Sequence, residues 1–196
     1  MLIDLHCHTF PLSQCSSLQV DRLASVALER GLDGICLTEH DRSWDRAMLD
    51  EARMRTGILM LAGMELTTDA GHVLAYGLGD YRADFAHART AFEAARDVGA
   101  LLFLAHPARD GALKVTAETV EMFESVEGIN GSDSRLQNLS VAGVARAFRA
   151  PAIGGSDAHT LAEVGRAATR FDDRIRDDGD LLAALRAGQY EAVNLG

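Results

Sequence analysis

Six of the seven histidines in this chain lie at or just beyond the ends of short apolar runs. These six are His6, His8, His40, His72, His106 and His159. A short apolar run bounded by glycine, proline or polar residues is typical of a buried strand. If such strands run parallel in a barrel, the residues at their carboxyl ends converge on one mouth. Imidazole and carboxylate groups together suit Zn, Mn and Fe, so the pattern predicts a multinuclear metal site.

The spacing within the polar segments supports this prediction. Strand side chains alternate between faces, so His6 and His8 share one face, as do Asp157 and His159. Asp4 faces the same way as the first pair, one step deeper, where it could orient a ligating imidazole. A single histidine in such a place is usually a core or surface residue. Two such pairs, with lone histidines at further strand ends, favour convergence.

Apolar runs and helical patterns alternate along the chain. Expected strands lie at 1–5, 34–38, 58–61, 73–77, 101–105, 126–130 and 151–155, and expected helices at 20–30, 47–55, 84–98, 117–124, 141–148 and 181–187. Alternation of this kind favours a mostly parallel sheet with helices outside it. About seven strands fit a distorted TIM-like (β/α)7 barrel better than an open sheet. With 196 residues, we expect one α/β domain over residues 1–196.

Composition limits the partners of this domain. The formal net charge of −10 argues against binding of long nucleic acid, because lysine and arginine supply most of the affinity for phosphate backbones. A small phosphorylated substrate stays open, since bound divalent cations reverse the local field. No apolar run is long enough to span a bilayer, and no signal-peptide pattern opens the chain. Three cysteines without C-x-x-C spacing indicate a reducing, cytoplasmic compartment.

Five short motifs occur in a characteristic order. They are Asp4–Thr9, Thr38–Asp41, Gly63–Glu65, Ala105–Pro107 and Gly155–Thr160. Together they resemble the motifs of the PHP (polymerase and histidinol phosphatase) superfamily, from residue 4 to about residue 170. The resemblance implies a distorted seven-stranded barrel that holds two or three divalent metal ions.

The resemblance also implies which side chains bind the ions. The sets are His6, His8, Glu65 and Asp157 for one ion, Glu65, His106 and His72 for a second, and His40 and His159 for a third. Gln14 stands where many relatives carry Asp or His. An amide oxygen is a weaker ligand, so we expect the third site to be the weakest.

Such a cluster predicts a phosphoesterase that hydrolyses small phosphomonoesters, such as nucleotide or metabolite phosphates, through a metal-activated hydroxide. Glu65 would bridge two ions, Asp157 would hold one, and His159 or a water at the third site would protonate the leaving oxygen. Arg109 and Arg135 are candidates to grip the phosphate through their planar guanidinium groups.

Two alternatives stay open at this point. The same cluster could cleave phosphodiesters, as a nuclease acting on short or terminal nucleotides, or the chain could be a non-catalytic, metal-stabilised module that binds a partner protein. No serine or cysteine stands in a relay with His and Asp, which disfavours a covalent nucleophile. His87 falls within an expected helix, and we predict that it lies outside the metal site.

Overall fold

The computed structural model describes residues 1–109 and 115–196. The strands in these residues are β1 (Leu2–Cys7), β2 (Gly34–Leu37), β3 (Leu59–Thr68), β4 (Gly71–Tyr76), β5 (Leu101–Leu104), β6 (Ser125–Asn130), β7 (Ile153–Gly155), β8 (Ala167–Phe171) and β9 (Tyr190–Asn194). The helices are α1 (Val20–Glu29), α2 (Arg46–Thr56), the 3-10 turn η1 (Ala83–Ala86), α3 (Ala88–Val98), α4 (Ala117–Met122), α5 (Arg135–Ala145) and α6 (Asp178–Ala187). Within the same residues, no helix has the length and hydropathy needed to span a bilayer.

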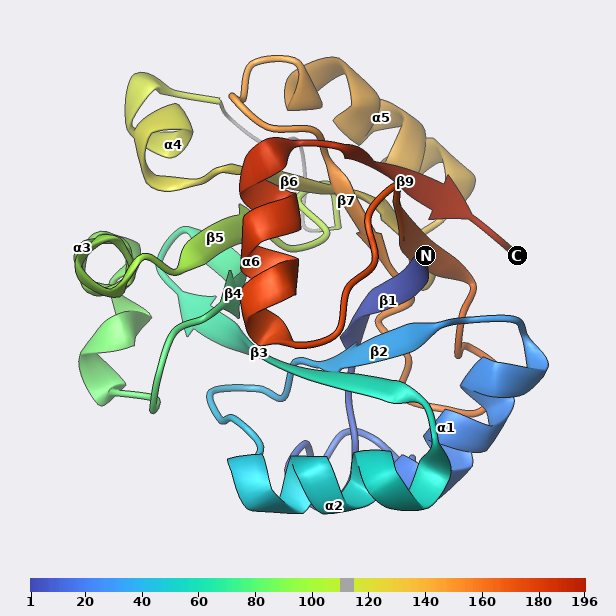
Figure 1. Cartoon of the computed structure of the whole chain (residues 1–196). Coiled ribbons are helices and arrows are strands. Elements are labelled where there is room, and N and C mark those ends of the chain that lie inside the picture. Colours follow the sequence, from blue (N-terminus) through green and yellow to red (C-terminus); the bar gives the residue numbers. More distant parts are fainter. Residues whose placement is uncertain (110–114) are drawn as a thin grey trace.

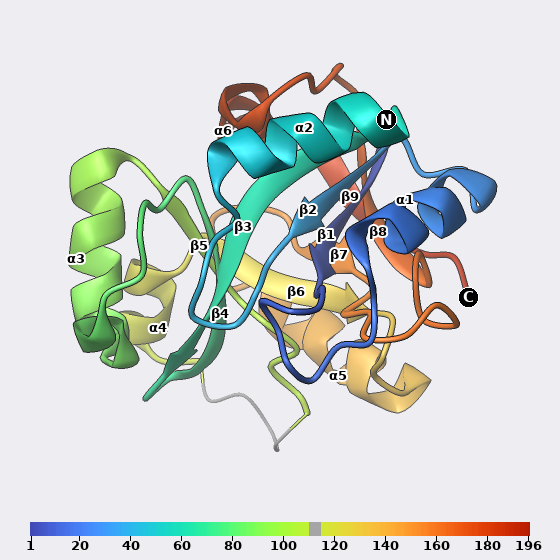
Figure 2. The ribbon, with the colours of Figure 1, turned by 90° about the horizontal axis from the view of Figure 1, so that it is seen from below.

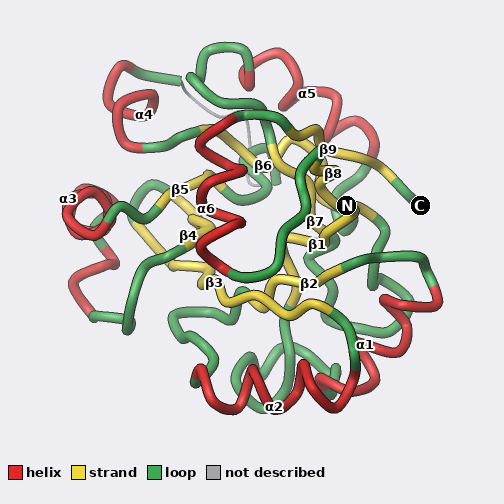
Figure 3. The backbone as a smooth tube through the Cα atoms, viewed as in Figure 1, coloured by secondary structure: helices red, strands yellow, loops and turns green. Residues whose placement is uncertain are grey.

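The strands form one curved sheet in the order β7-β6-β5-β4-β3-β2-β1-β8-β9 (Figures 1 and 3). The first strand of this order, β7, also lies beside β1 and β8, so the sheet curls into a nearly closed barrel. A barrel with helices around it agrees with the predicted α/β class.

The expectation of mostly parallel strands is only partly correct. Parallel pairing joins β1 to β2, β2 to β3, β5 to β6 and β6 to β7. Antiparallel pairing joins β3 to β4, β4 to β5, β1 to β8 and β8 to β9. The link between β3 and β4 is a tight turn at Asp69 and Ala70, which is too short for the crossover that parallel strands require.

Two layers of apolar side chains hold the barrel together. The inner layer takes residues from most strands, including Leu5, Leu61 and Phe103, and α6 covers one end of it through Leu181 and Leu185 (Figure 1). Outside the sheet, α1 and α2 pack on β1 to β3, while α3, α4 and α5 pack on β3 to β6 (Figure 2). This arrangement leaves the end opposite α6 for polar side chains.

Several element bounds differ from the sequence predictions. The strand expected at 58–61 continues to Thr68, because its second half pairs with β4 along its whole length. The helix expected at 84–98 is interrupted at His87, and the helix expected at 141–148 begins earlier, at a capping box formed by Ser134 and Gln137. The strands β8 and β9 were not predicted; β8, Ala167–Phe171, begins with two alanines and carries Arg170, so it does not form a continuous apolar run.

Barrel closure depends on a close approach between β7 and β1. A Cβ atom on Gly155 would lie 2.4 Å from His6 Cβ and 2.7 Å from His6 N. Just beyond Gly155, the Asp157 N–H donates to His6 O at 2.7 Å, and the His8 N–H donates to Ala158 O at 3.1 Å. Only glycine at position 155 allows these backbones to come this close.

We predict that Gly155→Ala destabilises the fold by about 3 kcal/mol or more, because overpacking here strikes backbone atoms that cannot yield. Gly143→Ala is the matched control, since an added Cβ at Gly143 in α5 meets no atom within 4 Å. That change should stabilise the protein by about 0.5–1 kcal/mol through helix propensity. Urea denaturation of both variants measures the difference; equal midpoints would show that closure does not depend on Gly155.

Candidate metal centre

Six histidines gather at the barrel end opposite α6, as predicted. His6 lies in β1 and His8 directly follows it, while His40, His106 and His159 come after β2, β5 and β7. His72 is the exception, since it stands at the start of its strand. Because β4 runs antiparallel to β3, its amino end lies at the same mouth as the carboxyl ends of the other strands. The hairpin therefore explains how His72 joins the cluster.

Glu65 is at the centre of the cluster and is almost completely buried. Its Oε2 lies 3.1 Å from His8 Nε2, 3.1 Å from His40 Nδ1 and 3.3 Å from His6 Nε2. Its Oε1 lies 2.8 Å from His72 Nδ1 and 3.0 Å from His106 Nε2. Each oxygen of this one carboxylate thus faces a different set of imidazoles.

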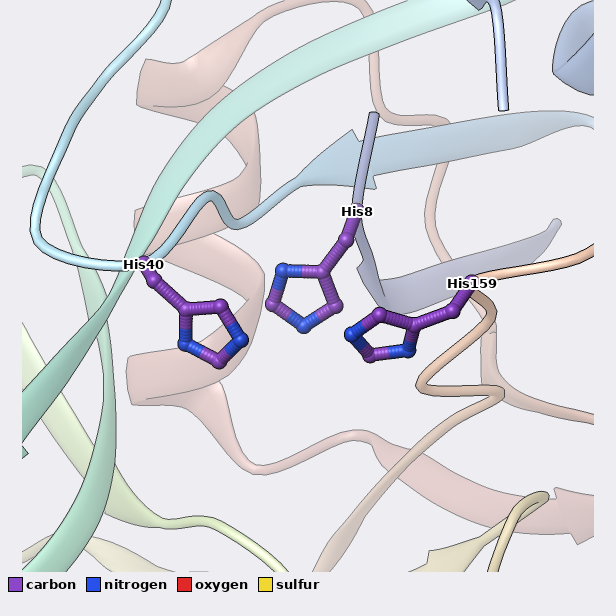
Figure 4. Close-up of side chains that lie close together, drawn as sticks. All are labelled: His8, His40 and His159. Carbon is purple, nitrogen blue, oxygen red and sulfur yellow. The ribbon is translucent and has the colours of Figure 1, made fainter. Parts of the chain in front are cut away.

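The ligand-type atoms form four overlapping groups, each with its atoms within 4.8 Å of one another. The groups are His6, His8 and Asp157; His6, Glu65 and His106; His40, Glu65 and His72; and His8, His40 and His159. The structure brings together all eight side chains named as ligands from the sequence. The groups differ from the predicted sets in two ways: His8 joins the pair expected for the third ion, and His72 groups with His40 and Glu65 rather than with His106. Figure 4 shows the rings of His8, His40 and His159 side by side, and His8 stacks between the other two.

Hydrogen bonds to the far side of two imidazoles orient them. His6 Nδ1 lies 2.9 Å from Glu127 Oε1. His8 Nδ1 lies 3.3 Å from Ser13 Oγ, and this hydroxyl donates its proton to the buried carboxylate of Glu39. The Ser13 hydroxyl is therefore left as the acceptor, so His8 carries its proton on Nδ1 and presents the lone pair of Nε2 to the cluster.

A divalent cation fits this geometry. The Nε2 atoms of His6 and His8 are 3.1 Å apart, where two lone pairs would repel unless a proton or a metal ion lies between them. Glu65 Oε2 is buried and accepts no hydrogen bond from any described residue, although three imidazole nitrogens surround it. A buried charge without such a partner is costly, and metal coordination would satisfy it.

The electrostatics of the cluster also favour cations. Burial raises the pKa of Glu65, but His6, His106 and His72 outweigh it and hold that pKa well below its usual range. Burial lowers the pKa of His6, yet the carboxylates of Glu127, Asp157 and Glu65 raise it well above its ordinary value. Metal ions must therefore displace protons from this site, so metal affinity should fall as the pH falls.

His40 behaves in the opposite way. Burial lowers the pKa of this imidazole to about 4; Glu65 opposes the shift, and the neighbouring rings of His8, His72 and His159 add to it. His40 is therefore neutral near pH 7, which is the form that coordinates a metal.

Two of the ligand-type residues at this mouth have backbone conformations that few non-glycine residues adopt. The φ angle is +28° at His106 and +52° at Asp157. Such strain persists only where the surroundings impose it, and it is concentrated at functional sites. Here the His106 N–H donates to Glu127 Oε2, and the Asp157 N–H donates to His6 O.

The two predicted phosphate-binding arginines lie in different surroundings. Arg109 reaches the site: its Nη2 is 2.7 Å from Asp157 Oδ2, and its Nε donates to Asp133 Oδ1 at 2.8 Å. One third of the Arg109 side chain is exposed. Arg135 is the first residue of α5, is exposed and makes no ion pair or hydrogen bond with a described residue.

Other expectations have mixed outcomes. Gln14 is exposed. His87 lies outside the cluster, as predicted, and contacts Asp69 on the surface. Asp4 does not orient an imidazole ring; its Oδ1 accepts from the backbone N–H groups of His6 and Ser156. Glu127 takes that place instead, and no motif pointed to it, because it lies in the middle of an ordinary strand.

Comparison with known proteins places this fold. Residues 135–190 match a family model described as PHP-associated. A two-domain protein from Bacteroides vulgatus ATCC 8482, predicted to contain a PHP-like metal-dependent phosphoesterase, matches 99% of the chain with a TM-score of 0.74 and 22% identity. The chain therefore has the same fold as this PHP-like protein. It spans 64% of the length of that Bacteroides protein.

Two further structures share this fold. A candidate metal-dependent phosphoesterase from Bifidobacterium adolescentis ATCC 15703 aligns over 95% of the chain and 96% of its own length, with a TM-score of 0.68 and 15% identity. Endonuclease Q, in complex with a 27-mer duplex that carries an abasic lesion at the active site, aligns over 97% of the chain and 58% of its own length, with a TM-score of 0.66 and 14% identity. No curated protein sequence gives a significant match.

We predict that Asp4→Asn changes the pH dependence of stability in the metal-free protein. Burial raises the pKa of Asp4 from 3.8 to about 6, although hydrogen bonds from Ser156 and His6 oppose the shift. A raised pKa means that the folded state binds the proton more tightly. The stability that this proton contributes is complete below about pH 4 and is lost as the pH rises through 6.

Asparagine does not titrate, so the variant should gain stability relative to the parent between pH 4 and 6.5, by on the order of 3 kcal/mol. Urea denaturation at several pH values measures this change, with Asp97→Asn on the exposed end of α3 as the surface control. A difference between Asp4→Asn and the parent that stays constant with pH would contradict the prediction.

Proposed function

We propose that this chain is a PHP-type domain and a metal-dependent phosphoesterase that hydrolyses small phosphomonoesters, such as nucleotide or metabolite phosphates. The observation that carries the proposal is the buried Glu65 carboxylate, which lies within 3.3 Å of a nitrogen atom of five different histidines. A structural metal site needs four ligands around one ion. Eight ligand-type side chains in four overlapping groups suit two or three ions and an open mouth.

The division of labour follows from the contacts. Divalent ions bound here would supply an activated water and neutralise the charge of the phosphate. The two oxygens of Glu65 face separate sets of histidines, which would fix two binding positions relative to each other. Asp157 divides its oxygens in the same way, with Oδ1 near His6 and His8 and Oδ2 on Arg109.

Two partly exposed side chains at the mouth would act on the substrate. Arg109 is held by Asp133 and Asp157 and would contact the phosphate with the exposed part of its guanidinium group. His159 is about one quarter exposed, and its Nδ1 lies 3.0 Å from the carbonyl oxygen of Asp157. That contact fixes the ring, so His159 could either complete the third site or protonate the leaving oxygen.

Phosphodiester cleavage is the second candidate, because Endonuclease Q shares the fold and its structure contains duplex DNA. The net charge of −10 weighs against a long nucleic acid as substrate of this chain. A small ester contacts only the mouth of the barrel, so the acidic surface does not oppose its binding. The net charge of the chain therefore favours a phosphomonoester as substrate.

We predict that protein stripped with chelator and reloaded with Mn, Zn or Fe retains at least two ions per chain and hydrolyses a panel of phosphomonoesters. The same preparation should act more slowly on a small phosphodiester and on duplex DNA with an abasic lesion. Elemental analysis and phosphate release measure both properties. Faster cleavage of the duplex would favour the nuclease alternative, and binding of fewer than one ion would defeat the metal centre.

Substitutions in the cluster connect the metal to the reaction. Glu65→Gln should lower metal content and reduce kcat/KM at least 100-fold, and Asp157→Asn should act in the same direction, because each removes an anionic ligand at nearly constant volume. His87→Ala is the control and should leave rate and metal content unchanged. Full activity in an Asp157→Asn protein shown to have lost metal would mean that the hydrolysis arises elsewhere.

We predict that Arg109→Ala lowers kcat/KM by about 10- to 100-fold, which corresponds to a charged hydrogen bond of roughly 1.5–3 kcal/mol. A rise in KM alone would indicate contact with the bound phosphate, and a fall in kcat would indicate contact in the transition state. Arg135→Ala tests the second arginine of the sequence prediction in the same assay. Unchanged kinetics in Arg109→Ala would leave Arg109 as a support for Asp157 only.

A further inference from the structure

Glu127 is a buried carboxylate that sits among three hydrogen-bond donors. Its Oε1 lies 2.9 Å from His6 Nδ1. Its Oε2 accepts from the backbone N–H of His106 at 2.9 Å and from Asn130 Nδ2 at 2.9 Å. The residue is 1% exposed and belongs to none of the ligand groups in the described residues. Glu127 therefore contacts His6 and His106 through atoms other than the Nε2 atoms that face Glu65.

The contact with His6 has a chemical consequence. A carboxylate can only accept hydrogen bonds, so His6 must carry a proton on Nδ1. Nε2 faces the cluster, 3.1 Å from His8 Nε2 and 3.3 Å from Glu65 Oε2, and a metal ion that displaces the proton there would bind its lone pair. A carboxylate behind a ligating imidazole also increases its basicity and fixes its orientation.

The contact with His106 acts on the backbone. His106 has a φ angle of +28°, which a residue with a side chain adopts only under constraint. The bond from its N–H to Glu127 Oε2 holds that conformation, and His106 Nε2 consequently reaches Glu65 Oε1 at 3.0 Å. One side chain thus supports two members of the group His6, Glu65 and His106.

We propose that Glu127 is a positioning residue of the metal centre, which holds His6 with its proton on Nδ1 and holds His106 in its strained conformation. The inference rests on the proposed metal site but not on the substrate. Asn130 extends the arrangement, because its Nδ2 also lies 3.3 Å from Asp157 Oδ2 and its Oδ1 accepts from Arg109.

Glu127→Gln and Glu127→Asp separate this role from a merely structural one. In the Gln variant the amide oxygen can satisfy His106 and Asn130 only if the NH2 group faces His6 Nδ1. The proton of His6 must then move to Nε2, where it blocks the ligand atom. We expect zinc affinity to fall about 10- to 100-fold. The Asp variant keeps a carboxylate acceptor but loses a methylene group. It should therefore melt at a lower temperature than the Gln variant and still bind zinc more tightly than the Gln variant does.

The experiment combines zinc competition titrations, thermal melting and ¹⁵N NMR of the histidine rings. Glu124→Gln is the matched control, because Glu124 is a partly buried carboxylate that pairs with Arg149. In the zinc-loaded parent, NMR should show the His6 proton on Nδ1 and zinc on Nε2. That measurement decides the matter even if a variant fails to fold, since a proton on Nε2 would overturn the proposal.

Zinc affinity within twofold of the parent in a folded Glu127→Gln protein would also overturn it, as would losses in zinc affinity that simply follow thermal stability in both variants. The outcome is independent of the reaction. A parent that binds zinc as described but hydrolyses no phosphate ester would contradict the proposed function and leave the role of Glu127 intact.

Discussion

The approach of β7 to β1 is the contact on which the rest of the structure depends. Gly155 packs against the backbone of His6, and the segment beyond it exchanges hydrogen bonds with His6 and His8. The same contact closes the barrel and brings the pair Asp157 and His159 beside the pair His6 and His8. Closure of the barrel and assembly of the site therefore depend on the same contact. A residue with a side chain at position 155 would separate both the strands and the ligand groups.

The second constraint is the charge enclosed by this closure. Glu65 is buried among imidazoles, and one of its oxygens accepts no hydrogen bond from the described residues. The metal-free fold therefore contains a buried negative charge that is not fully compensated. The neighbouring histidines lower the pKa of Glu65, while the carboxylates raise the pKa of His6. Bound cations would compensate this charge, so the same ions would stabilise the fold and take part in the proposed reaction.

The sequence predicts the ligand-type residues well because strand ends leave a simple pattern. Apolar runs followed by His or Asp indicate the mouth of a barrel, and the structure gathers the six histidines and Asp157 there. Glu65, the eighth side chain, was named by the resemblance to the PHP motifs. This pattern did not predict that β4 runs antiparallel to β3. His72 lies at the mouth because the amino end of an antiparallel strand is located there. Strand β8 was missed because its buried alanines resemble a helix or a loop.

Glu127 marks the limit of motif-based prediction. It lies between Val126 and Gly128 in a strand, and nothing in its neighbours along the chain distinguishes it from a surface glutamate. Its contacts with His6 and His106 come from β1 and from the end of β5, which only the folded barrel brings close. Residues that bind ions directly occur in motifs, whereas the residue that orients them is identified by geometry.

The most direct test of the metal centre is anomalous diffraction from crystals of manganese- or zinc-loaded protein, measured on both sides of the absorption edge of the metal. We predict at least two anomalous peaks at the mouth of the barrel, one within about 2.0–2.2 Å of each oxygen of Glu65. One of these peaks should also lie at ligand distance from the Nε2 atoms of His6 and His8. Fully loaded crystals without a peak beside Glu65, or with ions only on the surface carboxylates, would contradict this account.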